Sequence, residues 1–123
     1  MTKSFFILIT TLIITISMAF NIAKQDIIGN WKATEMENST INVYKADDGH
    51  IYGKIIESNR KDWVGELILK KVKYYSDDKV WKGEVYSLER KMSIDVTLNL
   101  ENQNKLKIVG KKFLMTKTFY WIR

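Results

Sequence analysis

The chain has 123 residues, with no cysteine and no proline, and its 20 lysines and arginines against 14 acids give a formal net charge of +6. The absence of cysteine excludes disulfides and thiolate-ligated metal sites, so packing and backbone hydrogen bonds must hold the fold together. A chain of this length builds one modest hydrophobic core, which predicts one domain.

The N-terminal segment has the pattern of a secretory signal peptide. Lys3 precedes an apolar run over 5–16, and small residues typical of a cleavage site follow it. The pattern predicts a signal peptide at 1–19, a mature domain at 20–123, and export to the periplasm or the medium. An uncleaved anchor that leaves the domain outside the cytoplasm is the alternative, because the uncharged stretch before Lys24 is just long enough to span a bilayer.

Beyond this segment, apolar and polar residues alternate with the period of two that is typical of half-buried β-strands. The clearest case is 92–100, where five apolar residues alternate with four polar ones. Clusters of Asn, Asp, Ser and Gly separate many of the runs and favour turns. The predicted strands are 27–35, 40–46, 50–57, 67–74, 79–86, 92–100, 105–110 and 116–122. The longest break, 58–65, is predicted to hold an irregular loop or a single helical turn.

Glycine placement favours a closed barrel over an open sheet. By alternation, four glycines point toward the apolar side of their strands: Gly29, Gly53, Gly83 and Gly110. Missing side chains relieve crowding where a sheet coils tightly, and closure removes the two edges that an open meander would expose. We therefore predict an all-β fold, a small antiparallel up-and-down β-barrel of about eight strands.

A Gly-x-Trp pair in the first strand and an arginine in the last form a pattern that resembles the lipocalin-like (calycin) barrels. In those barrels the arginine lies across the tryptophan and plugs one end. The resemblance implies this structural role for Gly29, Trp31 and Arg123. Trp121 shares a face of the last strand with Arg123, because side chains two apart point the same way.

Several short segments extend the resemblance over nearly the whole mature chain. The DUF2147 family of small exported bacterial proteins is similar in DIIGNWK at 26–32, VYKADDGHIYGKII at 43–56, W-x-G at 81–83, KLKIVG at 105–110 and TKTFYWIR at 116–123. After W-x-G, however, the chain reads YSLERKM, without the Asp-Pro turn and Gly-Lys pair usual in that family. The resemblance implies a lipocalin-like barrel, and it supplies no activity and no catalytic residues.

The residues assemble no catalytic or metal-binding set. His50 is the only histidine, and its place after an Asp-Asp-Gly turn is typical of a solvated turn residue. No second imidazole exists that could act as a general base for a serine or threonine nucleophile. Asp47 and Asp48 lack the spaced ligand series of an EF-hand. We therefore predict that the protein is not an enzyme and holds neither a metal nor a cofactor.

The first functional hypothesis is a carrier of a small apolar or amphipathic ligand, since a barrel of eight strands can enclose one such molecule. Bulky tryptophans argue for a filled interior, whereas the inward glycines are expected to free space near the mouth. The candidate cavity residues are Ile55, Val85, Met92, Ile94, Val96 and Ile108.

The second hypothesis is an envelope protein that docks on an anionic surface. Six cations and no acid follow Glu101, and such a patch attracts anionic lipid or acidic polysaccharide, while export disfavours nucleic acid. The candidate contacts are Trp63 in the long loop and Lys105, Lys107, Lys111 and Lys112. The interpretation that we prefer for these residues is structural: the lysines form a solvated sheet face and the tryptophan folds back onto the core. We expect a monomer in either case.

Overall fold

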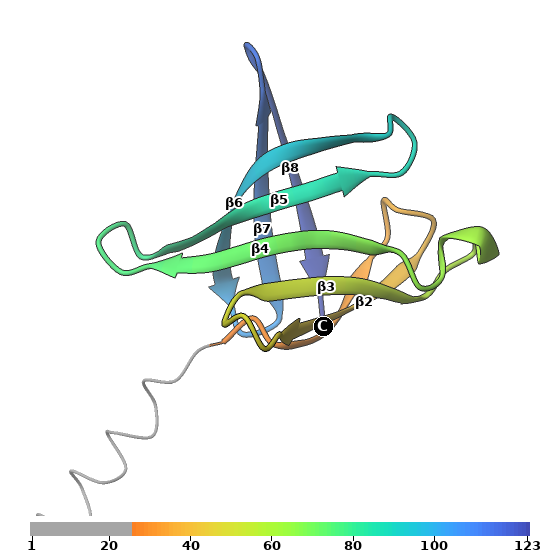
Figure 1. Cartoon of the computed structure of the whole chain (residues 1–123), viewed down its shortest axis with the longest axis horizontal. Coiled ribbons are helices and arrows are strands. Elements are labelled where there is room, and N and C mark those ends of the chain that lie inside the picture. The colour runs from red at the N-terminus through yellow and green to blue at the C-terminus, as the bar shows by residue number, and fades with distance from the viewer. Residues whose placement is uncertain (1–25) are drawn as a thin grey trace, which may run out of the picture.

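A computed structural model describes residues 26–123, so the predicted signal peptide at 1–19 and the predicted mature N-terminus at Phe20 lie outside the described residues. The chain forms a closed antiparallel barrel in which consecutive strands are neighbours (Figure 1). Its strands are β1 Gly29–Ala33, β2 Ser39–Lys45, β3 Ile51–Glu57, β4 Leu67–Tyr75, β5 Val80–Ser87, β6 Met92–Asn102, β7 Lys105–Lys112 and β8 Met115–Ile122. All eight predicted strands are confirmed.

The predicted helical turn in the longest connection is also present. It is the 3-10 helix η1, Lys61–Trp63, between β3 and β4. Within residues 26–123, none of the helical structure has the length and hydrophobicity needed to cross a bilayer.

Alternation along the strands builds the core, as the period of two predicts. In β7, Leu106, Ile108 and Gly110 are buried while the residues between them are half-buried. The ladder places Leu106 opposite Trp121 of β8, and both belong to one contiguous cluster of buried apolar side chains inside the barrel. Each such large side chain contributes about 1.5–3 kcal/mol by leaving water.

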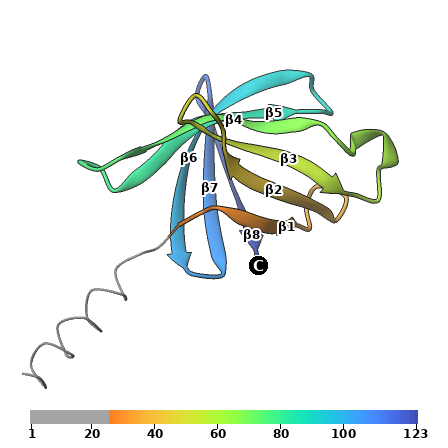
Figure 2. The ribbon, with the colours of Figure 1, turned by 60° about the horizontal axis from the view of Figure 1, so that its bottom comes forward.

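The seam that closes the barrel is much shorter than the other ladders. β1 and β8 share one register pair, Lys32 with Ile122, whereas β8 pairs with β7 along its whole length. Figure 2 shows β1 and β8 side by side at this seam. The short ladder means that side-chain contacts must help to join the first and last strands.

Two of the inward glycines, Gly53 and Gly83, do not free space, contrary to the expectation from the sequence. A Cβ added to Gly53 would lie 2.8 Å from Cβ of Leu69, and one added to Gly83 would lie 2.6 Å from Cγ2 of Val72. Neighbouring strands approach these positions so closely that their own side chains take the room. Gly53 and Gly83 therefore permit tight coiling of the sheet and leave no gap behind.

The up-and-down order puts alternate connections at opposite ends of the barrel. The C-terminal residue Arg123 and the turns that follow β2, β4 and β6 lie at one end, which we call the plug end. The connections that follow β1, β3, β5 and β7 lie at the other, the far end. In Figure 1 the β7–β8 hairpin, at the top, extends beyond the neighbouring strands.

Candidate functional site

The plug end is closed by Trp31 and Arg123, which the structure brings together. The guanidinium carbon of Arg123 lies 4.1 Å from the centroid of the Trp31 ring, and the Trp31 indole donates to the carbonyl of Ile27 at 2.8 Å. Arg123 also donates to the carbonyls of Ile28 and Asp26 at 3.1 and 3.0 Å, and to the carbonyl of Gln103 at 2.6 Å. The Arg123 side chain thus connects the residues just before β1 to the β6–β7 turn.

Gly29 is required at the plug for two reasons. Its φ of +131° is a backbone conformation that other residues rarely adopt, and a Cβ there would lie 3.6 Å from Nη1 of Arg123. The first reason is the stronger, because 3.6 Å is an ordinary contact. Gly29, Trp31 and Arg123 therefore form a structural unit, while Trp121 is buried in the core that continues from it.

The candidate cavity residues all lie on inward faces, but they are packed to different degrees. Ile55 and Ile108 are fully buried, and Val85 and Val96 nearly so. Met92 and Ile94, near the beginning of β6, are half-buried. Four of the six thus belong to the packed core cluster.

Among residues 26–123, two buried side-chain nitrogens have no hydrogen-bond partner: Nδ1 of His50 in the β2–β3 turn and Nε1 of Trp121 in the interior. Within residues 26–123, the indole Nε1 of Trp121 is enclosed and makes no hydrogen bond, although the residue is only 1% exposed. A buried donor without an acceptor costs about 1–3 kcal/mol. This atom is the polar feature of the interior that a ligand or a water molecule could satisfy.

Trp63 is buried, so the prediction that it forms an exposed surface contact is wrong. It is 7% exposed and belongs to the core cluster. The guanidinium of Arg60 covers its ring, with the guanidinium carbon 4.7 Å from the ring centroid. The preferred interpretation, in which the tryptophan folds back onto the core, is confirmed.

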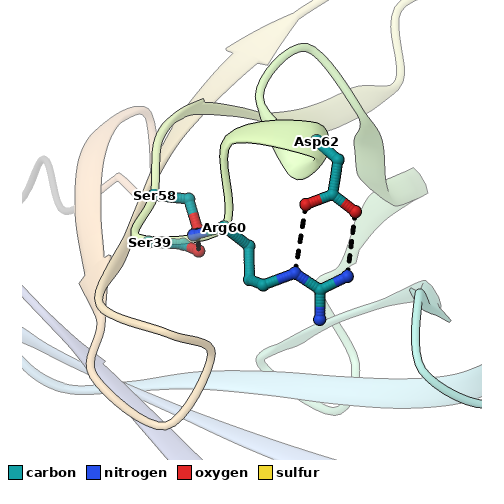
Figure 3. A network of polar contacts seen from close by, with 4 residues as sticks. All are labelled: Ser39, Ser58, Arg60 and Asp62. Carbon is teal, nitrogen blue, oxygen red and sulfur yellow. Dashed lines mark hydrogen bonds and ion pairs between the residues drawn. The ribbon is translucent and has the colours of Figure 1, made fainter.

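A small polar network holds this loop on the barrel (Figure 3). Arg60 forms two parallel hydrogen bonds with Asp62, at 3.0 and 2.8 Å, which lower the pKa of the Asp62 carboxyl. The hydroxyl oxygens of Ser39 and Ser58 lie 2.8 Å apart, and Ser58 accepts the backbone N–H of Arg60 at 3.1 Å. Both serines are buried, so the network joins the loop to the beginning of β2.

A second polar cluster lies in the β2–β3 turn at the plug end. Asp48 accepts the Tyr52 hydroxyl and the backbone N–H of His50. These bonds lower the pKa of Asp48, that of Tyr52 being the main cause, and the same bond raises the pKa of Tyr52. The geometry orders a tight turn.

The predicted lysine contacts do not share one face. Lys105, Lys107 and Lys111 alternate with buried residues of β7 and point outward. Lys112 has the same parity as the buried residues, and its ammonium donates to the carbonyl of Ser93 at 3.3 Å. Lys112 therefore lies on the other face of β7 from Lys105, Lys107 and Lys111, because the strand extends two residues beyond the predicted end and alternation continues.

The outward lysines are also less free than the sequence suggests. Lys105 and Lys107 are half-buried, and the Lys105 ammonium lies 4.6 Å from the centroid of the Tyr120 ring. Asp95 of β6 stands opposite Lys111. Although residues 102–123 contain no acid, the carboxylate-bearing Asp95 of the neighbouring strand lies beside them in the folded barrel.

The most exposed apolar residues were missed by the sequence predictions. Phe113 is 94% exposed, Leu114 102% and Met115 72%, and we call these three residues the apolar tip of the β7–β8 hairpin. A signal was available, because 111–115 separates two predicted strands and yet holds three large apolar residues and none of the usual turn formers.

Comparison with known proteins gives one result. The family model described as "Uncharacterized protein conserved in bacteria (DUF2147)" matches residues 29–123. No curated protein and no solved structure matches the chain. The match begins at the first residue of β1 and ends at Arg123, so it covers the whole barrel.

Proposed function

The chain belongs to the DUF2147 family of bacterial proteins, and on this premise we propose that it is an exported barrel protein that docks on an anionic surface of the cell envelope. The observation that carries the proposal is the cluster of cations at the end of the β7–β8 hairpin. Lys111, Lys112 and Lys117 lie within seven residues, and 102–123 contains no acid. Such a cluster attracts phosphate or carboxylate groups displayed on a surface.

The placement of the cations favours this hairpin over the sheet face as the docking element. Lys111 and Lys117 are exposed, and they flank the hairpin on its two faces, because their register partners are Thr116 and Gly110. The charges therefore surround the end of the hairpin. An element that projects from the barrel meets a flat surface without hindrance from the other strands.

A binding assay with charge variants tests the proposal. The protein is sedimented with vesicles of phosphatidylglycerol and phosphatidylcholine, and separately mixed with an acidic polysaccharide, at low and physiological salt. We expect binding that weakens with salt and is lost in the Lys111→Gln, Lys112→Gln, Lys117→Gln variant. The control changes Lys45, Lys54 and Lys73, exposed lysines of β2, β3 and β4, to glutamine, which removes equal charge elsewhere. Failure of the wild type to bind either anionic surface would overturn the proposal.

The carrier of a small apolar ligand is the second candidate, favoured by the unpartnered indole of Trp121. An amphipathic ligand inside the barrel would supply the missing acceptor. The contiguous packing of the interior argues against it. Native mass spectrometry of the protein purified from its own host distinguishes the two, because a carrier travels with an additional mass that denaturation releases.

Export is part of the proposal and has its own test. The signal at 1–19 predicts that the mature protein begins at Phe20 or a few residues later. N-terminal sequencing of the protein from the envelope fraction measures this directly. A chain that begins at Met1 and stays in the membrane fraction would show an anchor instead.

A further inference from the structure

The apolar tip exposes more hydrophobic surface than single exposed residues on a soluble protein normally do. Phe113, Leu114 and Met115 are consecutive, and the least exposed of them is 72% accessible. Isolated exposed apolar residues need no explanation, but a contiguous group at the end of a projecting element is typical of an interaction site. Because the apolar tip lies at the end of the projecting hairpin, a partner that approaches this end of the barrel would contact the tip before the other strands.

The backbone of the tip adds a second, independent observation. Phe113 and Leu114 form the two-residue turn between the register partners Lys112 and Met115, and Phe113 has a φ of +56°. Glycine and asparagine adopt this conformation readily, whereas a bulky side chain is strained in it. Glu37, Lys71, Lys79 and Lys91 also have a positive φ, so the backbone conformation alone does not single out the tip. What distinguishes the tip is that it carries an aromatic side chain in this conformation.

The charges around the tip identify the partner. Lys111 and Lys117 flank the tip on opposite faces of the hairpin, and the ammonium of Lys112 lies 5.8 Å from the centroid of the Phe113 ring. An apolar end surrounded by cations matches the two layers of an anionic bilayer, whose headgroups attract the lysines while its acyl chains accept the apolar side chains. A second copy of this chain fits less well, because joining two tips would bring their lysines together.

We infer that the apolar tip inserts into the interfacial layer of an anionic lipid bilayer, with Lys111 and Lys117 at the headgroups. The inference rests on the proposed function and narrows its anionic surface to lipid. The barrel then stays outside the bilayer, attached through one hairpin. Insertion predicts two components of binding, an electrostatic one that salt removes and an apolar one that salt leaves in place.

Vesicle binding of the full barrel separates these components. We compare the wild type with the Phe113→Ser, Leu114→Ser variant on vesicles of phosphatidylglycerol and phosphatidylcholine. We expect the variant to partition roughly tenfold or more weakly, since it loses the burial of two large side chains. The matched control is Ile56→Ser on β3, which removes an apolar side chain that is 45% exposed on another strand. Circular dichroism checks that each variant is folded.

A fluorescence measurement locates the tip in the bilayer. In a Leu114→Trp variant, lipids brominated on their acyl chains should quench the new tryptophan, while they should leave the emission of an Ile56→Trp variant unchanged. Of the four native tryptophans, Trp31, Trp63 and Trp121 are buried and Trp81 on β5 is half-buried. All four are present in both variants, so the wild-type emission measured with the same vesicles is subtracted as the background.

The outcomes distinguish the inference from the function on which it rests. If the wild type binds anionic vesicles but the tip variant binds equally and position 114 is not quenched, insertion is wrong and surface docking stands. If the wild type binds the polysaccharide and no vesicle, lipid is the wrong partner. If size-exclusion chromatography shows a dimer that the tip variant disrupts, while vesicle binding is unchanged, the tip serves a second copy of the chain and insertion is overturned.

Discussion

Arg123, the last residue, lies across Trp31 of the first strand, with its guanidinium carbon 4.1 Å from the centroid of the indole ring. The ladder between β1 and β8 contains a single register pair, so this contact carries much of the closure of the barrel. The carbonyls of Asp26, Ile28 and Gln103 hold the guanidinium in place. Closure thus depends on side-chain geometry at the plug end more than on backbone pairing.

The first prediction concerns this contact. Trp31→Ala should lower the free energy of unfolding by roughly 3–5 kcal/mol, because it leaves a large cavity. Arg123→Ala should cost about 1–3 kcal/mol through the loss of its hydrogen bonds. The double variant should cost less than the sum, because contacting residues are coupled. Urea unfolding measures all three, with Arg123→Ala combined with Val85→Ala as the additive control. Strict additivity for Trp31 and Arg123 would show that they do not interact in solution.

The second prediction ranks two glycines by the space around them. A Cβ at Gly83 would lie 2.6 Å from Cγ2 of Val72 and 2.8 Å from the carbonyl oxygen of Lys70, whereas the nearest atom to one at Gly110 is Cγ2 of Ile94 at 3.3 Å. The backbone oxygen cannot move without distorting β4, so Gly83→Ala should cost about 1–3 kcal/mol. Gly110→Ala should cost less, because the Ile94 side chain can shift. Denaturant unfolding of the two variants gives the order, and equal stability would contradict it.

Much of the fold could be predicted because local pattern and global structure agree. The alternation of Met92, Ile94, Val96 and Leu98 with polar residues sets both the strand and its buried face. The relation of Gly29 and Trp31 to Arg123 was implied by the resemblance to the calycin barrels. Topology agrees with it, because Arg123 directly follows the last strand and a closed meander makes the first and last strands neighbours.

The candidate surface was less predictable, because exposure depends on where each strand ends. Two more residues in β7 move Lys112 to the barrel side, and a single 3-10 turn is enough to bury Trp63. Asp95 of β6 lies opposite Lys111 of β7. This pairing depends on the register between the two strands, which the sequence of either strand alone does not determine. The apolar tip was not predicted, because apolar residues next to a strand are normally assigned to the core. Only the structure shows that this hairpin extends beyond the barrel.

The third prediction concerns pH and the bond between Asp48 and Tyr52. The bond lowers the pKa of Asp48 from its ordinary 3.8 and raises that of Tyr52 from 10.0. Its contribution to stability is therefore present above the ordinary pKa of Asp48 and is lost as pH falls through the lowered value; it is lost again as pH rises through the raised pKa of Tyr52. Tyr52→Phe should thus destabilise the protein at neutral pH and have little effect below the Asp48 pKa.

Urea unfolding at neutral and strongly acidic pH measures this difference. Tyr120→Phe, which changes a hydroxyl on β8, is the control and should show no such pH dependence. NMR titration of the Asp48 carboxyl should also give a higher pKa in the Tyr52→Phe variant. An unchanged pKa would contradict the assignment of the tyrosine as the main cause.

The fourth prediction concerns the loop that carries Trp63. Ser58→Ala removes the acceptor of the Arg60 N–H and one of the two partners of the buried Ser39 hydroxyl, which keeps its bond to the carbonyl of Met36. The loss of the Arg60 acceptor should cost about 1–3 kcal/mol. Trp63 should also become more accessible to acrylamide quenching, because the loop is released. Ser87→Ala is the matched control, since its hydroxyl accepts the N–H of Arg90 in an exposed turn. If Ser58→Ala is as mild as this control, the buried network does not hold the loop.

The fifth prediction is that one substitution, at Phe113, raises stability and weakens surface binding. Phe113 has a φ of +56°, a conformation that costs a bulky residue roughly 1 kcal/mol or more and that asparagine adopts readily. Phe113→Asn should therefore raise the free energy of unfolding by up to about 1 kcal/mol, since the exposed ring contributes no core packing. The same substitution should weaken binding to anionic vesicles, because it removes an inserted aromatic side chain.

The control for this prediction relieves the same strain at the opposite end of the barrel. Lys79, in the β4–β5 turn, has a φ of +57°, and Lys79→Asn should stabilise the protein by a similar amount without the loss of vesicle binding. Urea unfolding and vesicle sedimentation of both variants measure the two quantities together. A Phe113→Asn protein that is more stable and binds vesicles as the wild type does would show that the aromatic tip serves no lipid contact. If both properties change as expected, the strained turn is retained at the expense of stability because binding requires the aromatic ring.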